Sequence, residues 1–79
     1  MSELIEIKIE DPGNTEEVEV VEIAVEPGQT VAQGERLLEV ETDKANMDLE
    51  APAGGVVEEI RVAEGDVVEV TRVFAVLRT

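Results

Sequence analysis

Apolar and charged residues alternate along most of this chain, and that two-residue period restricts its fold more than any other feature. The clearest stretches are residues 5–9, 17–25, 38–41 and 46–49. Alternation of β-branched with charged residues is typical of strands that bury one face and expose the other. Turn residues separate these stretches at short intervals, at Pro12-Gly13-Asn14, Pro27-Gly28, Gly34, Pro52 with Gly54-Gly55, and Gly65-Asp66. No stretch carries a helical stripe, so we predict an all-β sandwich or flattened barrel of short strands.

The sequence also repeats itself in two units of about 40 residues. Residues 23–31 resemble residues 60–68 at an offset of 37, with a glycine at the same place in each. Residues 5–9 match residues 45–49 at an offset of 40, so we expect a longer loop in the first unit. The alternation slips in both units, at Val20-Val21 and at Glu58-Glu59. Since neither unit can cover its apolar face alone, we predict two similar sheets packed about a pseudo-twofold axis; chance similarity of valine-rich strands is the alternative.

Composition excludes several classes of function. The chain has 79 residues, which predicts a single domain spanning residues 1–79. Six Lys and Arg oppose twenty Asp and Glu, and a net charge of -14 disfavours nucleic-acid and anionic-membrane partners. Cysteine and histidine are absent, which excludes disulfides, the usual zinc sites and Ser-His or Cys-His catalysis. Any chemistry in which the domain takes part is therefore expected to reside on an attached group.

No segment has the pattern of a targeting signal or a membrane span. Residues 1–3 lack the basic region of a signal peptide, and no apolar run approaches the roughly 18 residues of a spanning helix. We therefore expect a cytoplasmic protein, either a small chain or one domain of a longer polypeptide.

The middle of the chain predicts a β-hairpin with Asp43 and Lys44 as its two loop residues. The expected cross-strand pairs are Val40–Met47 and Leu38–Leu49 on an apolar side, and Glu41–Asn46 and Glu39–Asp48 on a polar side. A slip of one residue would bury the acids, so burial fixes this register. Asp43-Lys44 lacks the glycine that primed turns prefer, so we expect a type I turn. By composition alone, the exposed lysine is a solvated surface residue.

The segment Glu41-Thr42-Asp43-Lys44-Ala45, set in the middle of a duplicated β-unit, resembles the lipoyl domain of the 2-oxo acid dehydrogenase complexes. The likeness extends over nearly the whole chain, through residues 5–9, 27–31, 51–57 and 64–68. It is greatest to the lipoyl domain of the dihydrolipoamide acyltransferase component. The resemblance implies a flattened barrel of two four-stranded antiparallel sheets, with a lysine at one hairpin tip and both termini at the opposite end.

The resemblance further implies that Lys44 receives lipoic acid in amide linkage from a lipoate ligase or lipoyl transferase. The domain would then be a carrier and not an enzyme. Its lipoyl arm would move between a thiamin-dependent 2-oxo acid decarboxylase, an acyltransferase core and dihydrolipoamide dehydrogenase. We expect a monomeric domain with no nucleic-acid or membrane partner. The alternatives are a biotinyl carrier, whose lysine usually has Met on both sides, and an unmodified β-sandwich adaptor that docks through its acidic faces.

Three neighbours of the lysine are candidate recognition residues: Glu41, Asp43 and Ala45. Asp43 either orients a modifying ligase or simply fills a turn position where Asp is common. Glu41 is either read by partners or is a solvated strand charge. Asp43 and Ala45 occupy the flanking positions seen in lipoyl domains, whereas family members often carry a glycine near Val70-Thr71 that this chain lacks.

Several other residues have a structural and a functional interpretation. We expect Gly34, Gly54 and Gly55 to satisfy backbone requirements, with contact to a ligase as the alternative. Met47 is expected to belong to the core. By resemblance, the loop at residues 11–17 would lie beside the lysine tip, where it either helps a decarboxylase recognise its carrier or simply varies as surface loops do.

Overall fold

Eight short strands make up the regular structure of the described residues. The computed structural model describes residues 3–9, 17–42 and 45–79. The strands are β1 (Leu4–Ile7), β2 (Glu17–Ile23), β3 (Thr30–Val31), β4 (Arg36–Glu41), β5 (Asn46–Glu50), β6 (Gly55–Ile60), β7 (Val67–Glu69) and β8 (Ala75–Arg78). The described residues contain no helix, and so none that could cross a membrane. The predicted all-β class is confirmed.

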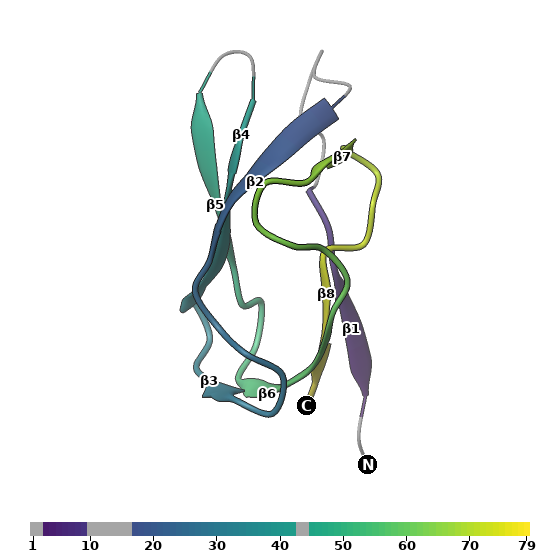
Figure 1. Ribbon diagram of the computed structural model, residues 1–79. Coiled ribbons are helices and arrows are strands. Elements are labelled where there is room, and N and C mark those ends of the chain that lie inside the picture. The colour runs from purple at the N-terminus through teal and green to yellow at the C-terminus, as the bar shows by residue number, and fades with distance from the viewer. Residues whose placement is uncertain (1–2, 10–16, 43–44) are drawn as a thin grey trace.

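The strands form two four-stranded antiparallel sheets that face each other across one core (Figure 1). The strand orders are β1-β8-β6-β3 and β5-β4-β2-β7. Val20, Val40 and Phe74 lie at the centre of the core with no exposed surface. The molecule is elongated, with principal extents of 38 × 21 × 18 Å. This is the flattened barrel-sandwich that the sequence predicts.

The two-residue period of the sequence determines which face of each strand is buried. In β2, Val18 and Val20 are buried whereas Glu17 and Glu19 are exposed. Burial of each such aliphatic side chain stabilises the fold by roughly 1.5–3 kcal/mol. The predicted slips in the alternation are irregularities in strand pairing, one between Val20 and Glu22 and one between Val57 and Glu59. At each slip an extra residue lets the strand bend while its apolar face stays inward.

The pseudo-twofold symmetry is present in the topology. Advancing every strand by four positions turns the order β1-β8-β6-β3 into β5-β4-β2-β7. Two turn glycines obey the same relation: Gly28 has φ of 89° and Gly65 has φ of 90°. The Gly28 N–H donates to the Val57 carbonyl and the Gly65 N–H to the Val20 carbonyl, both at 2.7 Å. Each half therefore closes its turn against the β-strand of the other half, as the duplicated sequence predicts.

One detail of the predicted repeat is wrong. The pair Ile5–Leu77 between β1 and β8 corresponds to the pair Met47–Val40 between β5 and β4. Residues on β1 and β5 are thus equivalent at an offset of 42, and not at the predicted 40. The error has a physical cause, because a two-residue period matches itself equally well after a shift of two, and only strand pairing distinguishes the registers.

The turn that lacks the expected glycine near Val70-Thr71 keeps its closing hydrogen bond. The Arg72 N–H donates to the Glu69 carbonyl at 3.0 Å, and the equivalent bond in the first half joins Glu35 to Ala32 at 3.1 Å. The missing glycine therefore leaves this closing bond of the last turn intact.

Candidate functional site

The β4–β5 hairpin has the predicted register. Its pairs are Leu38–Leu49, Glu39–Asp48, Val40–Met47 and Glu41–Asn46. Leu38, Val40 and Leu49 are buried, and Met47 is half-buried against the same core. The hairpin stands at one end of the molecule, and the N and C marks lie at the other (Figure 1). Burial of one face thus holds both arms of the hairpin in a fixed position.

Thr42 and Ala45 form the last described pair of the hairpin. The Thr42 N–H donates to the Ala45 carbonyl at 2.9 Å, and the Thr42 hydroxyl donates to the same carbonyl at 2.7 Å. In return, the Ala45 N–H donates to the Thr42 Oγ1 at 3.0 Å. Asp43 and Lys44, which join these two residues, lie outside the described residues, as does the predicted turn type.

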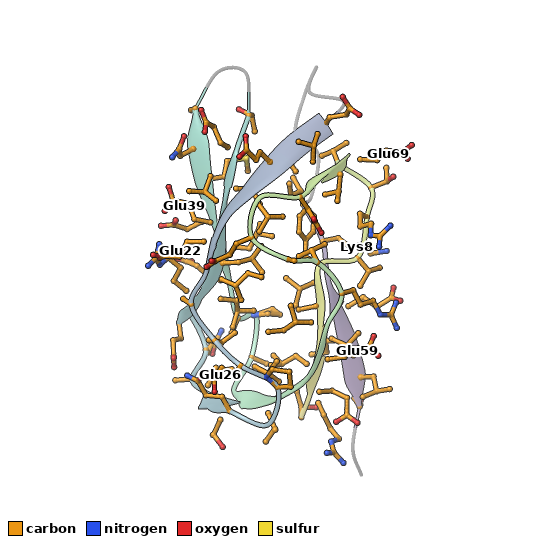
Figure 2. The ribbon with its side chains drawn as sticks, in the orientation of Figure 1. Lys8, Glu22, Glu26, Glu39, Glu59 and Glu69 are labelled. Carbon is orange, nitrogen blue, oxygen red and sulfur yellow. The ribbon has the colours of Figure 1, made fainter. Side chains whose placement is uncertain are left out.

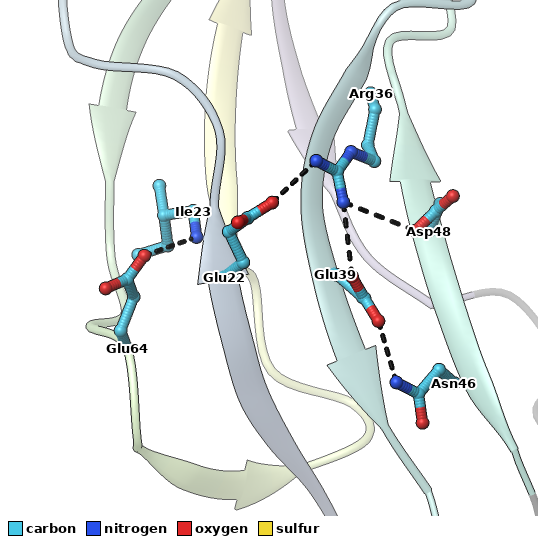
Figure 3. A network of polar contacts seen from close by, with 7 residues as sticks. All are labelled: Glu22, Ile23, Arg36, Glu39, Asn46, Asp48 and Glu64. Carbon is cyan, nitrogen blue, oxygen red and sulfur yellow. Dashed lines mark hydrogen bonds and ion pairs between the residues drawn. The ribbon is translucent and has the colours of Figure 1, made fainter.

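A polar network covers the outer face of the hairpin (Figure 3). Strand pairing places Glu22 opposite Glu39, and Glu39 opposite Asp48, so carboxylates repel each other across both ladders. The Arg36 guanidinium contacts Glu22 at 2.5 Å, Glu39 at 3.2 Å and Asp48 at 3.9 Å. The Asn46 amide donates to the second Glu39 oxygen at 2.7 Å, which extends the network toward the hairpin tip.

The outer faces of the two sheets differ in charge. The strands β2, β4, β5 and β7 carry Glu17, Glu19, Glu22, Glu39, Glu41, Asp48, Glu50 and Glu69, with Arg36 as their cation. On the other sheet, cations accompany the acids in the pairs Lys8–Glu6 at 3.5 Å, Arg78–Glu58 at 2.9 Å and Arg61–Glu59. The Glu59 hydrogen bond and charge raise the pKa of Arg61. Figure 2 shows Glu22 and Glu39 on one flank, and Lys8 and Glu59 on the other.

Two of the predicted recognition residues fall within the described part of the chain. Glu41 is exposed at the end of β4, where it faces Glu19 on one side and Asn46 on the other. Ala45 is exposed, and its backbone groups bond to Thr42. Asp43 lies outside the described residues, as do residues 11–16 of the predicted loop.

The three candidate glycines lie at the opposite end of the β4–β5 hairpin from Thr42 and Ala45. Gly34 has φ of 85°, and its N–H donates to the Ala51 carbonyl at 2.8 Å, just beyond the end of β5. A Cβ on Gly55 would lie 2.4 Å from the Arg78 carbonyl oxygen, so only glycine fits there. A Cβ on Gly54 would lie at an ordinary 3.6 Å from the Val31 carbonyl oxygen. The positive φ of Gly34 and the close approach at Gly55 explain a requirement for glycine, whereas the contacts of Gly54 do not.

Sequence reasoning missed Thr42. Thr42 lies directly after β4 and two residues after the buried Val40, where the alternation favours an apolar side chain, yet it carries a hydroxyl group. Ser and Thr beside turns commonly bond to the neighbouring backbone through their hydroxyl groups. That local preference is the signal that would have identified Thr42.

The described residues show no metal site at the hairpin. In them, no group of three or more acidic side chains could hold a metal ion. A groove of about 280 Å³ lies between the edge strands β1 and β5, lined by residues that include Ile5, Lys8, Leu49 and Pro52. This groove does not include Thr42 or Ala45.

Comparisons with known proteins agree with this geometry. The model of the biotin/lipoyl family, described as "Biotin-requiring enzyme", matches residues 5–77. The chain is 46% identical over 65 residues to the dihydrolipoyllysine-residue acetyltransferase component of the pyruvate dehydrogenase complex of Haemophilus influenzae. It is 42% identical over 62 residues to the component of the same name from Cupriavidus necator. It is 44% identical over 52 residues to the dihydrolipoyllysine-residue succinyltransferase component of the 2-oxoglutarate dehydrogenase complex of Bacillus subtilis.

The matched segments are short parts of these relatives. They cover 82%, 78% and 66% of this chain but only 11%, 11% and 12% of the three relatives, respectively. The similarity therefore concerns one domain of much longer proteins. Because the family model matches nearly all of the chain, from Ile5 to Leu77, this chain belongs to the biotin/lipoyl family.

Proposed function

We propose that this chain is a lipoyl carrier domain in which Lys44 bears lipoic acid in amide linkage. The pairing of Thr42 with Ala45 carries the proposal, because it leaves Asp43 and Lys44 as the connection at the end of a hairpin held by the core. Family membership and the names of the relatives, which contain dihydrolipoyllysine, favour the same group.

The other lysine of the chain is a poorer acceptor. Lys8 lies between Ile7 and Ile9, which are 4% and 7% exposed. The Ile7 carbonyl accepts a hydrogen bond from the Phe74 N–H at 2.8 Å, and the Lys8 ammonium is 3.5 Å from Glu6. A modifying enzyme that needs to surround its lysine would have to pull both isoleucines from the core, so we assign Lys44 as the acceptor.

The attachment is an acyl transfer to an amine. The neutral Lys44 amine attacks the carboxyl carbon of lipoate activated as an acyl adenylate, a nitrogen–carbon bond forms, the bond to AMP breaks, and the amine proton passes to solvent. When bound, lipoic acid supplies a dithiolane capable of thiol–disulfide exchange, a chemistry that a chain without cysteine lacks. The chain's own part is to hold the lysine on a rigid support.

The partners follow from this role. We propose a lipoate ligase or lipoyl transferase, a thiamin-dependent 2-oxo acid decarboxylase, an acyltransferase core and dihydrolipoamide dehydrogenase, with the domain serving as carrier and not as catalyst. The acidic outer face beside the hairpin favours docking on basic surfaces, and added salt should weaken such docking. Tethering within a complex raises the effective concentration of the arm at each active site.

A biotinyl carrier is the second candidate, because the matching family includes it by description. Asp43 and Ala45 stand where biotinyl domains usually carry methionine, which disfavours a biotinyl carrier. The mass of the attached group separates the two candidates, since biotin and lipoic acid differ in mass.

The test is intact-mass measurement after incubation with lipoate ligase, lipoate and ATP. The native chain and the matched control Lys8→Arg are expected to gain one lipoyl group, and Lys44→Arg is expected to gain none. A lipoyl adduct that persists in Lys44→Arg, or a native chain that accepts only biotin from a biotin ligase, would overturn the proposal.

A further inference from the structure

We propose that Thr42 is a positioning residue for the modification, because its side-chain hydroxyl closes the hairpin that carries the acceptor lysine. This inference rests on the proposed function. It assigns a role to a residue that lies outside the predicted recognition set of Glu41, Asp43 and Ala45.

The hydroxyl acts as donor and acceptor toward one residue. It donates to the Ala45 carbonyl at 2.7 Å and accepts from the Ala45 N–H at 3.0 Å. In a simple β-turn the N–H of the fourth residue donates to the carbonyl of the first. Here the Ala45 N–H bonds to the side chain of Thr42, so the hydroxyl serves the role that this backbone carbonyl would serve.

The pseudo-twofold symmetry supplies an internal comparison. At the offsets found in the fold, Thr42 is equivalent to Thr79 and Ala45 to Glu3. The Thr79 N–H donates to the Glu3 carbonyl at 2.9 Å, which matches the bond from Thr42 to Ala45. The Glu3 N–H donates to the Thr79 backbone carbonyl at 3.4 Å. The equivalent threonines thus share one backbone bond, and they differ in the second: the acceptor is a backbone carbonyl at the open end and the hydroxyl oxygen at the hairpin.

The position of Thr42 explains why its hydroxyl affects the acceptor. Thr42 is half-buried and continues the face of Val40, so its backbone is anchored by the core. Its hydroxyl extends that anchoring across the hairpin to Ala45, the residue directly after the lysine. Loss of the hydroxyl would leave the Ala45 N–H without this partner and would leave the Thr42 N–H as the remaining donor from Thr42 to the Ala45 carbonyl, so the residue directly after the lysine would be held less firmly.

The test compares lipoylation kinetics of Thr42→Val with those of the native chain. Valine keeps the branched shape and removes the hydroxyl. We expect kcat for lipoylation to fall about tenfold to a hundredfold with KM for the domain nearly unchanged, since misplacement of a reacting group affects the chemical step. Amide hydrogen exchange at Ala45 is expected to be about tenfold faster. Thr42→Ser is expected to restore both quantities, and the symmetry-matched control Thr79→Val to leave both unchanged.

The outcomes separate this inference from the proposed function. A native chain that gains no lipoyl group overturns the proposed function, whereas the Ala45 exchange rate still reports on the hydrogen bond. If the native chain is modified and Thr42→Val is modified at the same rate, the positioning role is wrong and the carrier function stands. If Thr42→Ser is as slow as Thr42→Val, the hydroxyl group is not the cause and the inference also fails.

Discussion

The two ends of the molecule carry equivalent pairs of strands, and they differ in how the last residues of each pair are joined. At one end β4 and β5 are joined by a two-residue connection, and at the other β8 and β1 pair in the same register with no connection between them. At both ends the threonine N–H donates to the opposite carbonyl, but the Ala45 N–H donates to the Thr42 hydroxyl, whereas the Glu3 N–H donates to the Thr79 backbone carbonyl. One duplicated unit thereby produces a closed hairpin and, at the far end, the paired termini (Figure 1).

The two ends of the long axis therefore have different roles. The acceptor proposed here belongs to the closed end, and the chain enters and leaves the fold at the open end. The outer faces also differ in charge. The strands of the sheet that contains the hairpin carry many acids with Arg36 as their cation, whereas the acids of the other sheet are paired with cations more evenly. The two halves of the molecule have a symmetrical topology, and their polar residues make one end and one face distinct.

The largest expected effect tests whether the two halves contribute equally to the core. Phe74 and Leu37 are equivalent by the offset of 37 and are 0% and 1% exposed. Phe74→Ala should lower the free energy of unfolding by about 3–5 kcal/mol and Leu37→Ala by about 2–5 kcal/mol, because each leaves a cavity. Chemical denaturation measures both. A loss below about 1 kcal/mol at either position would show that the core is not shared by the two halves.

An intermediate loss of stability is expected at Gly55, the first residue of β6, which lies against Arg78 of β8. Gly55→Ala places a methyl group 2.4 Å from the Arg78 carbonyl oxygen, so the β6–β8 ladder must shift. We expect a loss of about 1–3 kcal/mol in unfolding free energy, as for other overpacked sites. The neighbouring Gly54→Ala is the matched control, since its methyl group has an ordinary 3.6 Å contact. Equal melting temperatures for the two variants would contradict the close approach at Gly55.

The smallest effect concerns the charge difference between the two faces. Arg36→Met removes the cation from Glu22, Glu39 and Asp48, and Arg78→Met removes it from Glu58 alone. Because exposed ion pairs contribute about 0–1 kcal/mol each, we expect Arg36→Met to cost up to about 1 kcal/mol and Arg78→Met less. Thermal unfolding in rising salt should reduce the difference between the two variants. A difference that does not respond to salt would exclude an electrostatic cause.

The sequence predicted the hairpin register because local alternation and burial determine it. It also predicted the two slips in strands β2 and β6, since an extra residue in an alternating strand is visible in the sequence. The offset of the first strand was missed because a period of two is unchanged by a shift of two residues. Only the pairing of Ile5 with Leu77 and of Met47 with Val40 resolves it.

Two features of the site depend on polar contacts that the alternating pattern does not predict. The Arg36 network requires the pairing of β2 with β4, including the irregularity between Val20 and Glu22, which brings Glu22 opposite Glu39. The Thr42 hydroxyl bonds to both backbone groups of Ala45, and the residue types alone do not specify this partner. The alternating pattern therefore predicts which residues face the core, and the tertiary structure decides which polar groups meet.

The most direct test of the account moves the acceptor by one position. The double variant Asp43→Lys with Lys44→Asp keeps the composition, the mass and the net charge of the chain. If position on the hairpin selects the modified lysine, intact-mass measurement after incubation with lipoate ligase, lipoate and ATP will show a lipoyl adduct on the native chain and none on the double variant. An equal extent of lipoylation in the two proteins, with both folded, would contradict the account.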